Sequence, residues 1–471
     1  MCQWHIFSTD PKCERANQFL RGYIMNTHEM DMTTGSLWKK IFVFSIPLMF
    51  SNLLQVFFNM ADVAVIGRFV GAIALGAVGS TTIIVTLTTG ILLGMASGVN
   101  AVTALFVGSR DSERVKKTVH TAILICLAAG ILLLLSGLFF TRPLLTLMNT
   151  KPELIDGAAL YLTVYLCGSP ALAVYNYGNA ILSAIGDTKR PLTYLAIAGV
   201  INVILNLIFV LVFHLGVLGV ALASIISQYI SAFLVLKFLL QCKQDYGLRT
   251  RNISFDRAIA GRILKISVPS AVQYSLFAVA NLCIQTAVNS FDHVIVEGNS
   301  AASNADTLVY DMMAAFYTAC TSFIAQNLGA GKKKRIWHSY LITTLYSFLV
   351  GLILGLCIFI LQKPFLSLFT SDPDVMKYAR IRISIMGLCY CISAFMDNAT
   401  AAARGLGKSV EPTLIVILGS VVFRVIWIYT VFAYFHTLQS LYLVYVSAWI
   451  LTAICGNLFF IHHYRKLQTS P

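Results

Sequence analysis

The amino-acid sequence predicts an all-α membrane protein in which twelve transmembrane helices form two pseudo-symmetric six-helix bundles. Two observations support the prediction: an apolar composition and an internal repeat. Hydrophobic residues make up 58% of the 471 residues and charged residues only 11%, whereas a soluble domain carries roughly 25% charged residues. The apolar residues fall in blocks long enough for the roughly 20 residues of helix that cross a bilayer.

Twelve apolar blocks are predicted to span the membrane. They lie at residues 41–66, 77–106, 118–140, 157–183, 192–213, 217–240, 264–290, 302–328, 338–361, 378–403, 412–434 and 439–462. Segments on the N-terminal side of the membrane hold 26 of the 34 Lys and Arg residues, the opposite side holds seven, and Arg424 falls inside a span. Because cytoplasmic loops carry an excess of Lys and Arg, both termini are predicted to be cytoplasmic.

Landmark residues in the first half of the chain recur in the second half at an offset of 221 or 222 residues. The matched pairs are Pro47 with Pro269, Gly108 with Gly329, Gly186 with Gly407 and Pro191 with Pro412. Six spans per half mean that both halves enter the membrane from the same side, so the repeats are parallel. We therefore expect a V-shaped pair of bundles around a central cavity, with one half rocking against the other.

The chain divides accordingly into five segments. Residues 1–36 form a polar cytoplasmic segment, 37–240 the first bundle, 241–263 a cytoplasmic linker, 264–463 the second bundle and 464–471 a cytoplasmic tail. The net charge of +14 is spread in short clusters between spans, which indicates a lipid bilayer as partner and argues against nucleic acid. Most of the 11 cysteines lie inside apolar blocks, where a free thiol behaves as a small hydrophobe.

Ionisable side chains inside the first bundle are candidates for function, since a charge at the bilayer centre costs at least about 2.5–3.5 kcal/mol. Asp62 lies late in the first span. If the Asp62 carboxylate faces a cavity, its burial lets it hold a proton or exchange that proton for a cation. The alternative is a carboxylate at the end of a helix that reaches water at the membrane interface. Asn202 and Asn206 share one face of the fifth span, where they either support a carboxylate or join helices by hydrogen bonds.

The second bundle holds its own candidates. Asp397, in the tenth span, matches Asn176 in the repeat, so one half has an acid where the other has an amide. Asp397 is either a second cation-binding carboxylate or the partner of a buried arginine, Arg424 or Arg404. Asp311 in the eighth span and Arg424 in the eleventh are further ionisable candidates.

Pro47 and Pro269 occupy matched positions in the first span of each half. Proline removes a backbone hydrogen bond and bends a helix. Each proline is therefore either a hinge for alternating access or a static kink.

Four motifs follow one another along the chain. The first is Ile46-Pro47 with residues 62–67 and 74–79, the second runs from Gly178-Asn179 through 186–191 to Asn202, the third is 326–332, and the fourth is Asp397 with 404–408. Together these motifs resemble the multidrug and toxic compound extrusion (MATE) transporters, in particular the DinF-like and bacterial multidrug branches. The resemblance extends over residues 38–462, nearly the whole chain.

The resemblance implies a multidrug efflux antiporter that exports small organic cations in exchange for H⁺ or Na⁺ by alternating access. It implies a bacterial cytoplasmic (inner) membrane location and no cofactor, and we expect a monomer. The coupling residues implied by the resemblance are Asp62, Asn202 and Asp397, and we add Asn206 because it shares a helix face with Asn202. If Na⁺ is the coupling ion, Asp62 or Asp397 is expected to be its ligand. We expect Asn176, Asn179, Asp311 and Arg424 to line the substrate cavity.

Two departures from the family pattern leave the coupling ion open. Relatives often carry an acid one turn after the amide of the fifth span, where this chain has Asn206, and a Glu in the seventh span, where residues 273–281 contain no acid. A lipid-linked oligosaccharide flippase of the same superfamily is the alternative, disfavoured by twelve rather than fourteen spans and by Arg424 as the single clear intramembrane base. An enzyme would need a nucleophile constellation at membrane depth, and a channel would not need a hinge-bearing repeat.

Overall fold

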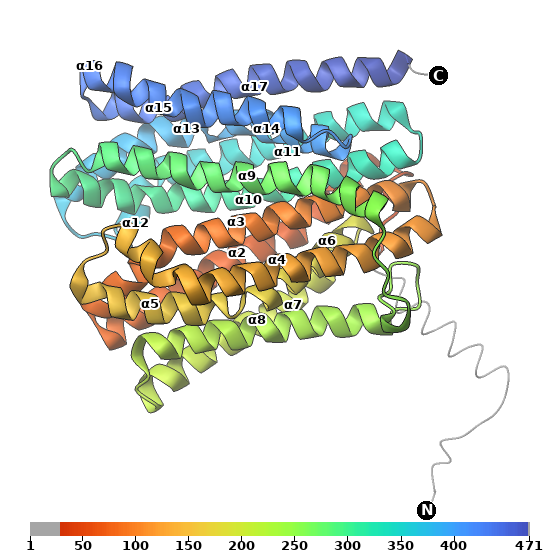
Figure 1. Cartoon of the computed structure of the whole chain (residues 1–471). Coiled ribbons are helices and arrows are strands. Elements are labelled where there is room, and N and C mark those ends of the chain that lie inside the picture. Colours follow the sequence, from red (N-terminus) through yellow and green to blue (C-terminus); the bar gives the residue numbers. More distant parts are fainter. Residues whose placement is uncertain (1–28, 470–471) are drawn as a thin grey trace, which may run out of the picture.

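The computed structural model describes residues 29–469, and this part of the chain is helical apart from short connections (Figure 1). Eleven of the described helices are long and apolar enough to span a membrane. The pair α5 (Pro152–Leu166) and α6 (Ser169–Ala184), which meet at a bend of 44°, brings the number to twelve if it is counted as one broken span. The all-α membrane fold is confirmed, with eleven or twelve candidate spans among residues 29–469. Residues 1–28 of the predicted N-terminal segment and 470–471 of the predicted tail lie outside the described range.

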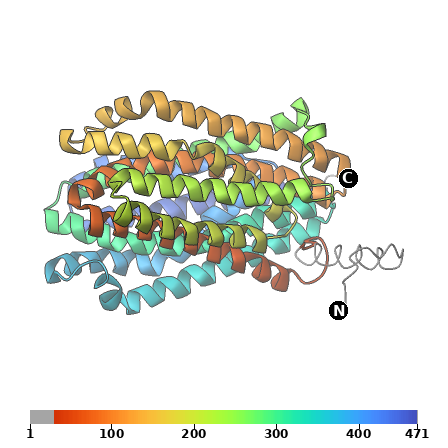
Figure 2. The same cartoon turned by 90° about the horizontal axis from the view of Figure 1, so that it is seen from below.

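The first half contains six spans when the α5–α6 pair is counted as one, and they run side by side (Figure 2). They are α2 (Leu37–Val65) with the π-helical turn η1 (Ile66–Val70), α3 (Ala72–Gly108), α4 (Ser112–Leu147), the α5–α6 pair, α7 (Lys189–Leu207) with the π-helical turn η2 (Ile208–Val212), and α8 (Gly216–Gln241). A connection with one 3₁₀ turn, η3 (Thr250–Asn252), leads to the second half.

The second half repeats this order. Its spans are α9 (Arg257–Val288), α10 (His293–Gly329), α11 (Lys333–Ile360) followed by the short α12 (Gln362–Leu366), α13 (Pro373–Gly405), a composite eleventh span, and α17 (Leu438–Thr469). The composite span consists of α14 (Val410–Val416), η4 (Ile417–Val422), α15 (Phe423–Trp427), η5 (Ile428–Phe432) and α16 (Ala433–Phe435), of which η4 and η5 are π-helical. In Figure 1 the two halves lie against each other along α2, α3, α9 and α10.

The repeat extends to single hydrogen bonds beside the two matched prolines. The Thr188 hydroxyl donates to the carbonyl oxygen of Phe44 at 3.0 Å, and the Ser409 hydroxyl donates to that of Ile266 at 3.1 Å. Each carbonyl lies three residues before a proline of the first span in its half. In both halves the loop after the fourth span therefore ties down the helix next to its kink.

The loops that carry these hydroxyls depend on glycine. Gly186 has φ of 91° and Gly407 has φ of 77°, a region that residues with a Cβ rarely adopt. Gly186 also packs against the backbone of Met30, because a Cβ there would lie 2.7 Å from the Met30 nitrogen. The sequence landmarks thus correspond to backbone geometry.

The halves pack tightly at the end of the molecule where α2 begins and α17 finishes, which we call the terminus end (Figure 1). A Cβ on Gly108 would lie 2.0 Å from the carbonyl oxygen of Gln326, and one on Gly329 would lie 2.0 Å from that of Leu105. Such distances are far inside van der Waals contact. The two glycines therefore let the ends of α3 and α10 touch backbone to backbone in a pseudo-symmetric pair.

Contact between α3 and α9 continues away from this end. Cβ atoms on Gly98, Gly94 and Gly90 would meet Ser267, Ala271 and Tyr274 at 2.1, 2.4 and 3.0 Å. A buried hydrogen bond of 3.0 Å from Ser322 to Asn100 also joins the halves. Small residues permit this close packing of helices where no hydrophobic force acts between them in lipid.

Candidate functional site

Asp62 lies inside the first half, one turn before the π-helical turn η1. Its carboxylate accepts hydrogen bonds from Asn206 Nδ2 of α7 and, at 3.2 Å, from Ser224 Oγ of α8. Asn206 Nδ2 also donates to Asn202 Oδ1 at 3.2 Å. The structure therefore brings together Asp62, Asn202 and Asn206, which were all predicted from the sequence. It adds Ser224, which nothing in the sequence distinguishes from Ser227 and Ser231 on the same helix.

The surroundings of Asp62 are neutral. Tyr161 and Tyr165 of α5 lie within electrostatic range of the carboxylate. Between residues 29 and 469 no Lys, Arg or His nitrogen approaches Asp62 within 4.0 Å. The carbonyl oxygen Oδ1 of Asn206 is buried and has no hydrogen-bond partner. The described surroundings of this carboxylate thus offer an unpartnered acceptor oxygen and no compensating cation.

Both helices that carry the acid and the amide change from α to π geometry just beyond them. The π-helical turn η1 starts at Ile66 and η2 starts at Ile208. The π-helical turns end the two spans, with Gly71 following η1 and Phe213 following η2.

The second half holds Asp397 on α13 in a different environment. Tyr310, Tyr317, Arg404 and Arg424 all lie within electrostatic range of its carboxylate. In the described structure neither arginine comes within the 4.0 Å of an ion pair. The structure therefore places Asp397 among the two arginines named from the sequence without joining it directly to either.

The two arginines instead donate hydrogen bonds to amides of α9. Arg404 Nη2 donates to Gln273 Oε1 at 2.7 Å, and Arg424 Nη1 donates to Asn281 Oδ1 at 3.1 Å. Arg404 and Arg424 are 8% and 3% exposed. Gln273 and Asn281 belong to the stretch of the seventh span that the sequence singled out as free of acids, and their contact with buried arginines was not predicted.

The prediction that Arg424 is the single intramembrane base is wrong. Arg404 is buried, and Arg382, one of the seven basic residues assigned to the side opposite the N-terminus, is 4% exposed and pairs with Asp306 of α10. Asn299 accepts a further hydrogen bond from Arg382, and Tyr390 donates one to Asp306. A cation close to a helix end can reach water, but here a carboxylate on the adjacent helix holds it inside the bundle.

Asp311 lies where the two halves meet. Its backbone carbonyl accepts a hydrogen bond of 2.6 Å from Asn52 of α2. Its half-buried carboxylate has no hydrogen-bond or ion-pair partner among residues 29–469. An unpaired carboxylate at an interface between helices is costly unless it meets water or a ligand.

The remaining predicted residues lie apart from these groups. Asn176 of α6 is buried with its Nδ2 unpartnered, and Asn179 accepts a hydrogen bond of 3.4 Å from Ser183 on the same helix. Neither is joined by a hydrogen bond to Asp62 or Arg424 in the described structure. Pro47 and Pro269 lie inside α2 and α9, as expected from their positions in the first span of each half.

Beyond the tight contacts, polar side chains on the facing helices become exposed. We call this set the far interface: Gln55 and Asn59 of α2, Thr82 and Thr86 of α3, Asn281 of α9, and Asn304 and Thr307 of α10. Each of these residues lies three to eight positions along its helix from a residue that touches the other half nearer the terminus end. It therefore belongs to the same side of that helix. Because polar groups are unfavourable in lipid, this face is expected to meet water.

The terminus end is closed by residues 29–36, which we call the N-terminal strap. The Met30 amide donates to the Ile185 carbonyl of the first half at 3.2 Å, and the Met32 amide donates to Gln326 Oε1 of the second half at 3.2 Å. Arg335 of α11 donates to the carbonyls of Met32, Thr34 and Gly35 at 3.2, 3.2 and 2.9 Å. The Met32 side chain is fully buried. The strap therefore binds both halves at once.

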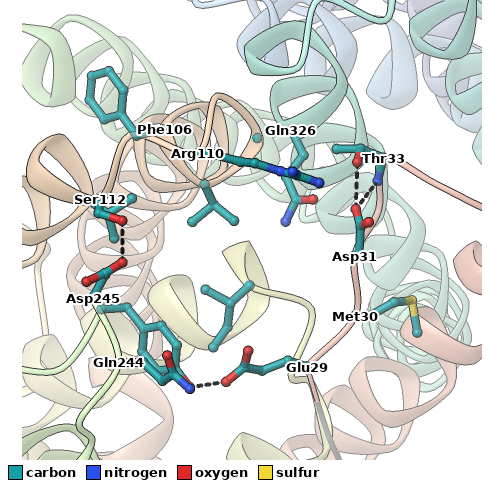
Figure 3. Close-up of a pocket in the computed structure, with 15 residues that line it drawn as sticks. Glu29, Met30, Asp31, Thr33, Phe106, Arg110, Ser112, Gln244, Asp245 and Gln326 are labelled. Carbon is teal, nitrogen blue, oxygen red and sulfur yellow. Dashed lines mark hydrogen bonds between the residues drawn. The ribbon is translucent and has the colours of Figure 1, made fainter. Parts of the chain in front are cut away.

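A cavity of about 400 Å³ lies beside the strap, between the end of α3 and the connection from α8 to α9 (Figure 3). Figure 3 shows Arg110 extending toward Gln326 and Thr33. Three carboxylates on its wall already accept hydrogen bonds, namely Asp31 from Thr33, Glu29 from Tyr246 and Asp245 from Ser112. We therefore treat this cavity as part of the strap's surroundings.

Within residues 29–469 no three His, Cys, Asp or Glu side chains converge in a way that could hold a metal ion. The described oxygen groups around Asp62 are a carboxylate, an amide and a hydroxyl. Hard cations such as Na⁺ are bound through oxygen atoms, so these groups suit such an ion in kind.

The fold and these sites define a helical, multi-pass membrane transporter with two pseudo-equivalent halves. The MatE family model matches residues 47–208 and again 269–430, together 324 of the 471 residues. The chain belongs to the MATE family of multidrug efflux transporters. The two matches are offset by 222 residues, which confirms the repeat read from the sequence.

Relatives and solved structures agree with this family. The chain is 28% identical over 377 residues to the probable multidrug resistance protein YpnP of Bacillus subtilis, covering 80% of this chain and 84% of that one. It is 26% identical over 353 residues to an FAD transporter of Shewanella oneidensis, covering 74% and 77%. An outward-facing structure of a multidrug resistance MATE transporter superposes with a TM-score of 0.87 at 22% identity, covering 93% and 98%, which shows the shared fold.

Proposed function

We propose that the protein exports small organic cations across the bacterial cytoplasmic membrane in exchange for H⁺ or Na⁺, as a monomer. The observation that supports this proposal is the Asp62 carboxylate, which accepts hydrogen bonds from the neutral Asn206 and Ser224 and has no ion-pair partner between residues 29 and 469. A carboxylate in a low-dielectric site is neutralised by a proton or a bound cation. The unpartnered Asn206 Oδ1 beside it is a suitable further ligand.

The excess of Lys and Arg assigns the terminus end to the cytoplasm. With that orientation, the strap and the glycine contacts close the cytoplasmic side, and the far interface faces outward. In this state an ion enters from outside and neutralises Asp62. The transition is driven by the different affinities of the two conformations for ion and substrate, with Pro47 and Pro269 as hinges.

The proposal assigns substrate contact to the second half. Asp311 supplies an unpaired carboxylate at the interface for an organic cation. Asp397, which lies among tyrosines and arginines, acts as the second coupling carboxylate. Asn202 and Asn206 orient Asp62.

A lipid-linked oligosaccharide flippase is the second candidate. One observation favours it, because Arg382, Arg404 and Arg424 are all buried in the second half. Such a protein would move a lipid-linked glycan independently of Asp62.

The test is efflux of the cationic dye ethidium from proteoliposomes under a proton gradient and, separately, a sodium gradient. We expect one gradient to drive dye movement in the unmodified protein and Asp62→Asn to abolish that dependence, while ethidium still exchanges passively. Gradient-driven efflux that survives Asp62→Asn would exclude Asp62 from coupling. Failure of both gradients to move the dye would overturn cation antiport.

A further inference from the structure

We propose that Arg424 and Asn281 form a binding site for an anionic group, so that the preferred substrates carry a carboxylate or a similar anion as well as a cationic centre. The inference deepens the proposed function and rests on it. It begins from the arginines buried in the second half, which that function does not use.

Positive charge is in excess in this region. Three guanidinium groups, on Arg382, Arg404 and Arg424, are buried among two carboxylates, on Asp306 and Asp397. The negative charge of Asp306 is neutralised by its ion pair with Arg382. Asp397 is shared between the other two arginines at more than ion-pair distance. An unmatched buried charge is costly, so a retained excess indicates a ligand of opposite sign.

The Arg424 side chain is held in place by rings, and its hydrogen-bond donors are not all used within residues 29–469. Its guanidinium carbon lies 4.8 Å from the Tyr445 ring centre and 5.7 Å from that of Phe277. Of its five N–H donors, one is used in a hydrogen bond to Asn281, and the buried Nε has no partner. Rigid guanidinium edges are the preferred partners of carboxylate and phosphate oxygens.

A neighbouring arginine adds to the positive charge around Arg424. Tyr445 lies against both Arg424 and Arg382, whose guanidinium carbon is 5.3 Å from the ring centre. Arg382 already has a carboxylate, an amide and two rings around it. Arg424 therefore gains the most from an arriving anion.

Access to Arg424 is through Asn281. Asn281 is exposed in the far interface, two helical turns beyond Tyr274, the last α9 residue that packs on a glycine of α3. Asn281 accepts from Arg424, so its own amide hydrogens are free to donate to a ligand. Arg404 differs, because its partner Gln273 is 6% exposed and lies level with the α3–α9 contact. Of the two acceptor amides, Asn281 is exposed and Gln273 is buried, so a ligand can reach Arg424 by way of Asn281.

The test uses two dyes that differ in one group. Rhodamine 110 has a free carboxylate, and rhodamine 123 is its methyl ester, so both have the same cationic ring system. Binding to the purified full chain in nanodiscs is measured by fluorescence anisotropy. We expect rhodamine 110 to bind about tenfold more tightly than rhodamine 123, the ratio that one charge-assisted hydrogen bond supplies.

Two variants probe the site and a third controls for charge. Arg424→Gln and Asn281→Asp should each bring the ratio of the two dissociation constants close to one. Asn281→Asp keeps the arginine and gives it a carboxylate partner within the protein. A loss of preference in this variant therefore cannot be explained by a buried arginine site that fails to fold. Asn59→Asp adds the same charge to the far interface on α2 and should leave the preference for rhodamine 110 in place.

The inference is overturned if the unmodified protein binds both dyes equally, or if Asn281→Asp lowers both affinities by the same factor. Failure of the proposed function looks different. In that case neither ion gradient drives rhodamine 123 efflux, whatever the ratio of affinities.

Discussion

Asn206 of α7 donates its side-chain amide to the Asp62 carboxylate of α2, and the same nitrogen donates to Asn202. Its carbonyl oxygen remains buried without a partner. The hydrogen bond to the carboxylate is charge-assisted and worth about 1.5–3 kcal/mol, whereas the amide–amide bond is worth about 0.5–1.5 kcal/mol. We therefore propose that Asn206 has a larger influence than Asn202 on how readily Asp62 accepts an ion.

Replacing Asn206 by alanine should change the ion dependence of efflux by about tenfold or more, since 1.4 kcal/mol corresponds to a factor of ten. If the ion is H⁺, loss of a donor to the carboxylate favours protonation, and half-maximal efflux moves to higher pH. If the ion is Na⁺, loss of the Asn206 oxygen raises the half-saturating Na⁺ concentration. Efflux rates measured against pH and against Na⁺ separate these outcomes.

Asn202→Ala is the matched control, because it removes only the neutral hydrogen bond. Its shift should be smaller than that of Asn206→Ala. Equal shifts for the two variants would show that the contact with Asp62 has no special weight.

Alanine at Gly108 or Gly329 should open the terminus end. Each added Cβ would lie 2.0 Å from a backbone carbonyl oxygen of the other half, and such overpacking costs about 1–3 kcal/mol. We expect faster hydrogen–deuterium exchange of residues 104–112 and 326–332 in either variant. Gly261→Ala, where no atom lies within 4 Å of the new Cβ, should exchange like the unmodified protein. Unchanged exchange in Gly108→Ala would mean that these ends are already apart in the membrane.

The sequence was enough to predict the helices and the repeat, because both depend on long periodic patterns and on residues with special backbone roles. Gly186 and Gly407 were found by spacing alone, and both have positive φ in the structure. Asp62 and Asn206 were predicted to be functional because they are polar, since a carboxylate and an amide are rare inside apolar spans.

The site residues of the second half were predicted less well, because hydrogen bonds and ion pairs between side chains of different helices cannot be predicted from local sequence. Arg382 was counted with the basic residues on the side of the membrane opposite the N-terminus, and only the packing of α13 on α10 brings it to Asp306. Likewise Gln273 and Asn281 are ordinary amides in the sequence, and they become notable only as the acceptors from Arg404 and Arg424. Ser224 is a third such case, as one of several serines on α8.

Arg335→Gln should release the N-terminal strap, because it removes hydrogen bonds to three strap carbonyls. We expect faster hydrogen–deuterium exchange of residues 30–36 and a larger fraction of molecules open at the cytoplasmic side. Lys334→Gln, a neighbouring exposed lysine on α11, is the control and should leave the strap protected. Identical protection in both variants would show that the buried Met32 alone holds the strap.

Protection of the strap should also be the same at pH 8 and pH 5.5. Burial alone would raise the pKa of Asp31, but hydrogen bonds from Thr33 and Thr34 outweigh it and lower the pKa from 3.8 to about 2. A lowered carboxylate pKa contributes stability that is present above pH 3.8 and is lost as the pH falls toward 2. Exchange that accelerates between pH 8 and 5.5, after correction for the intrinsic rate, would contradict this assignment.

The ion pair of Arg382 with Asp306 should stabilise the second half only as a pair. Its side chains are 5% and 16% exposed, and removing one partner of a buried pair typically costs about 3–5 kcal/mol because the other charge is left uncompensated. Arg382→Met and Asp306→Asn should therefore each lower the thermal unfolding temperature in detergent, and the double variant should lose less than the sum of the two. Arg142→Met breaks a pair with Asp156 whose side chains are 68% and 79% exposed, and should cost less than about 1 kcal/mol. Strictly additive losses in the double variant would mean that the two residues act through separate contacts, with Arg382 held by Asn299 and the tyrosine rings rather than by the carboxylate.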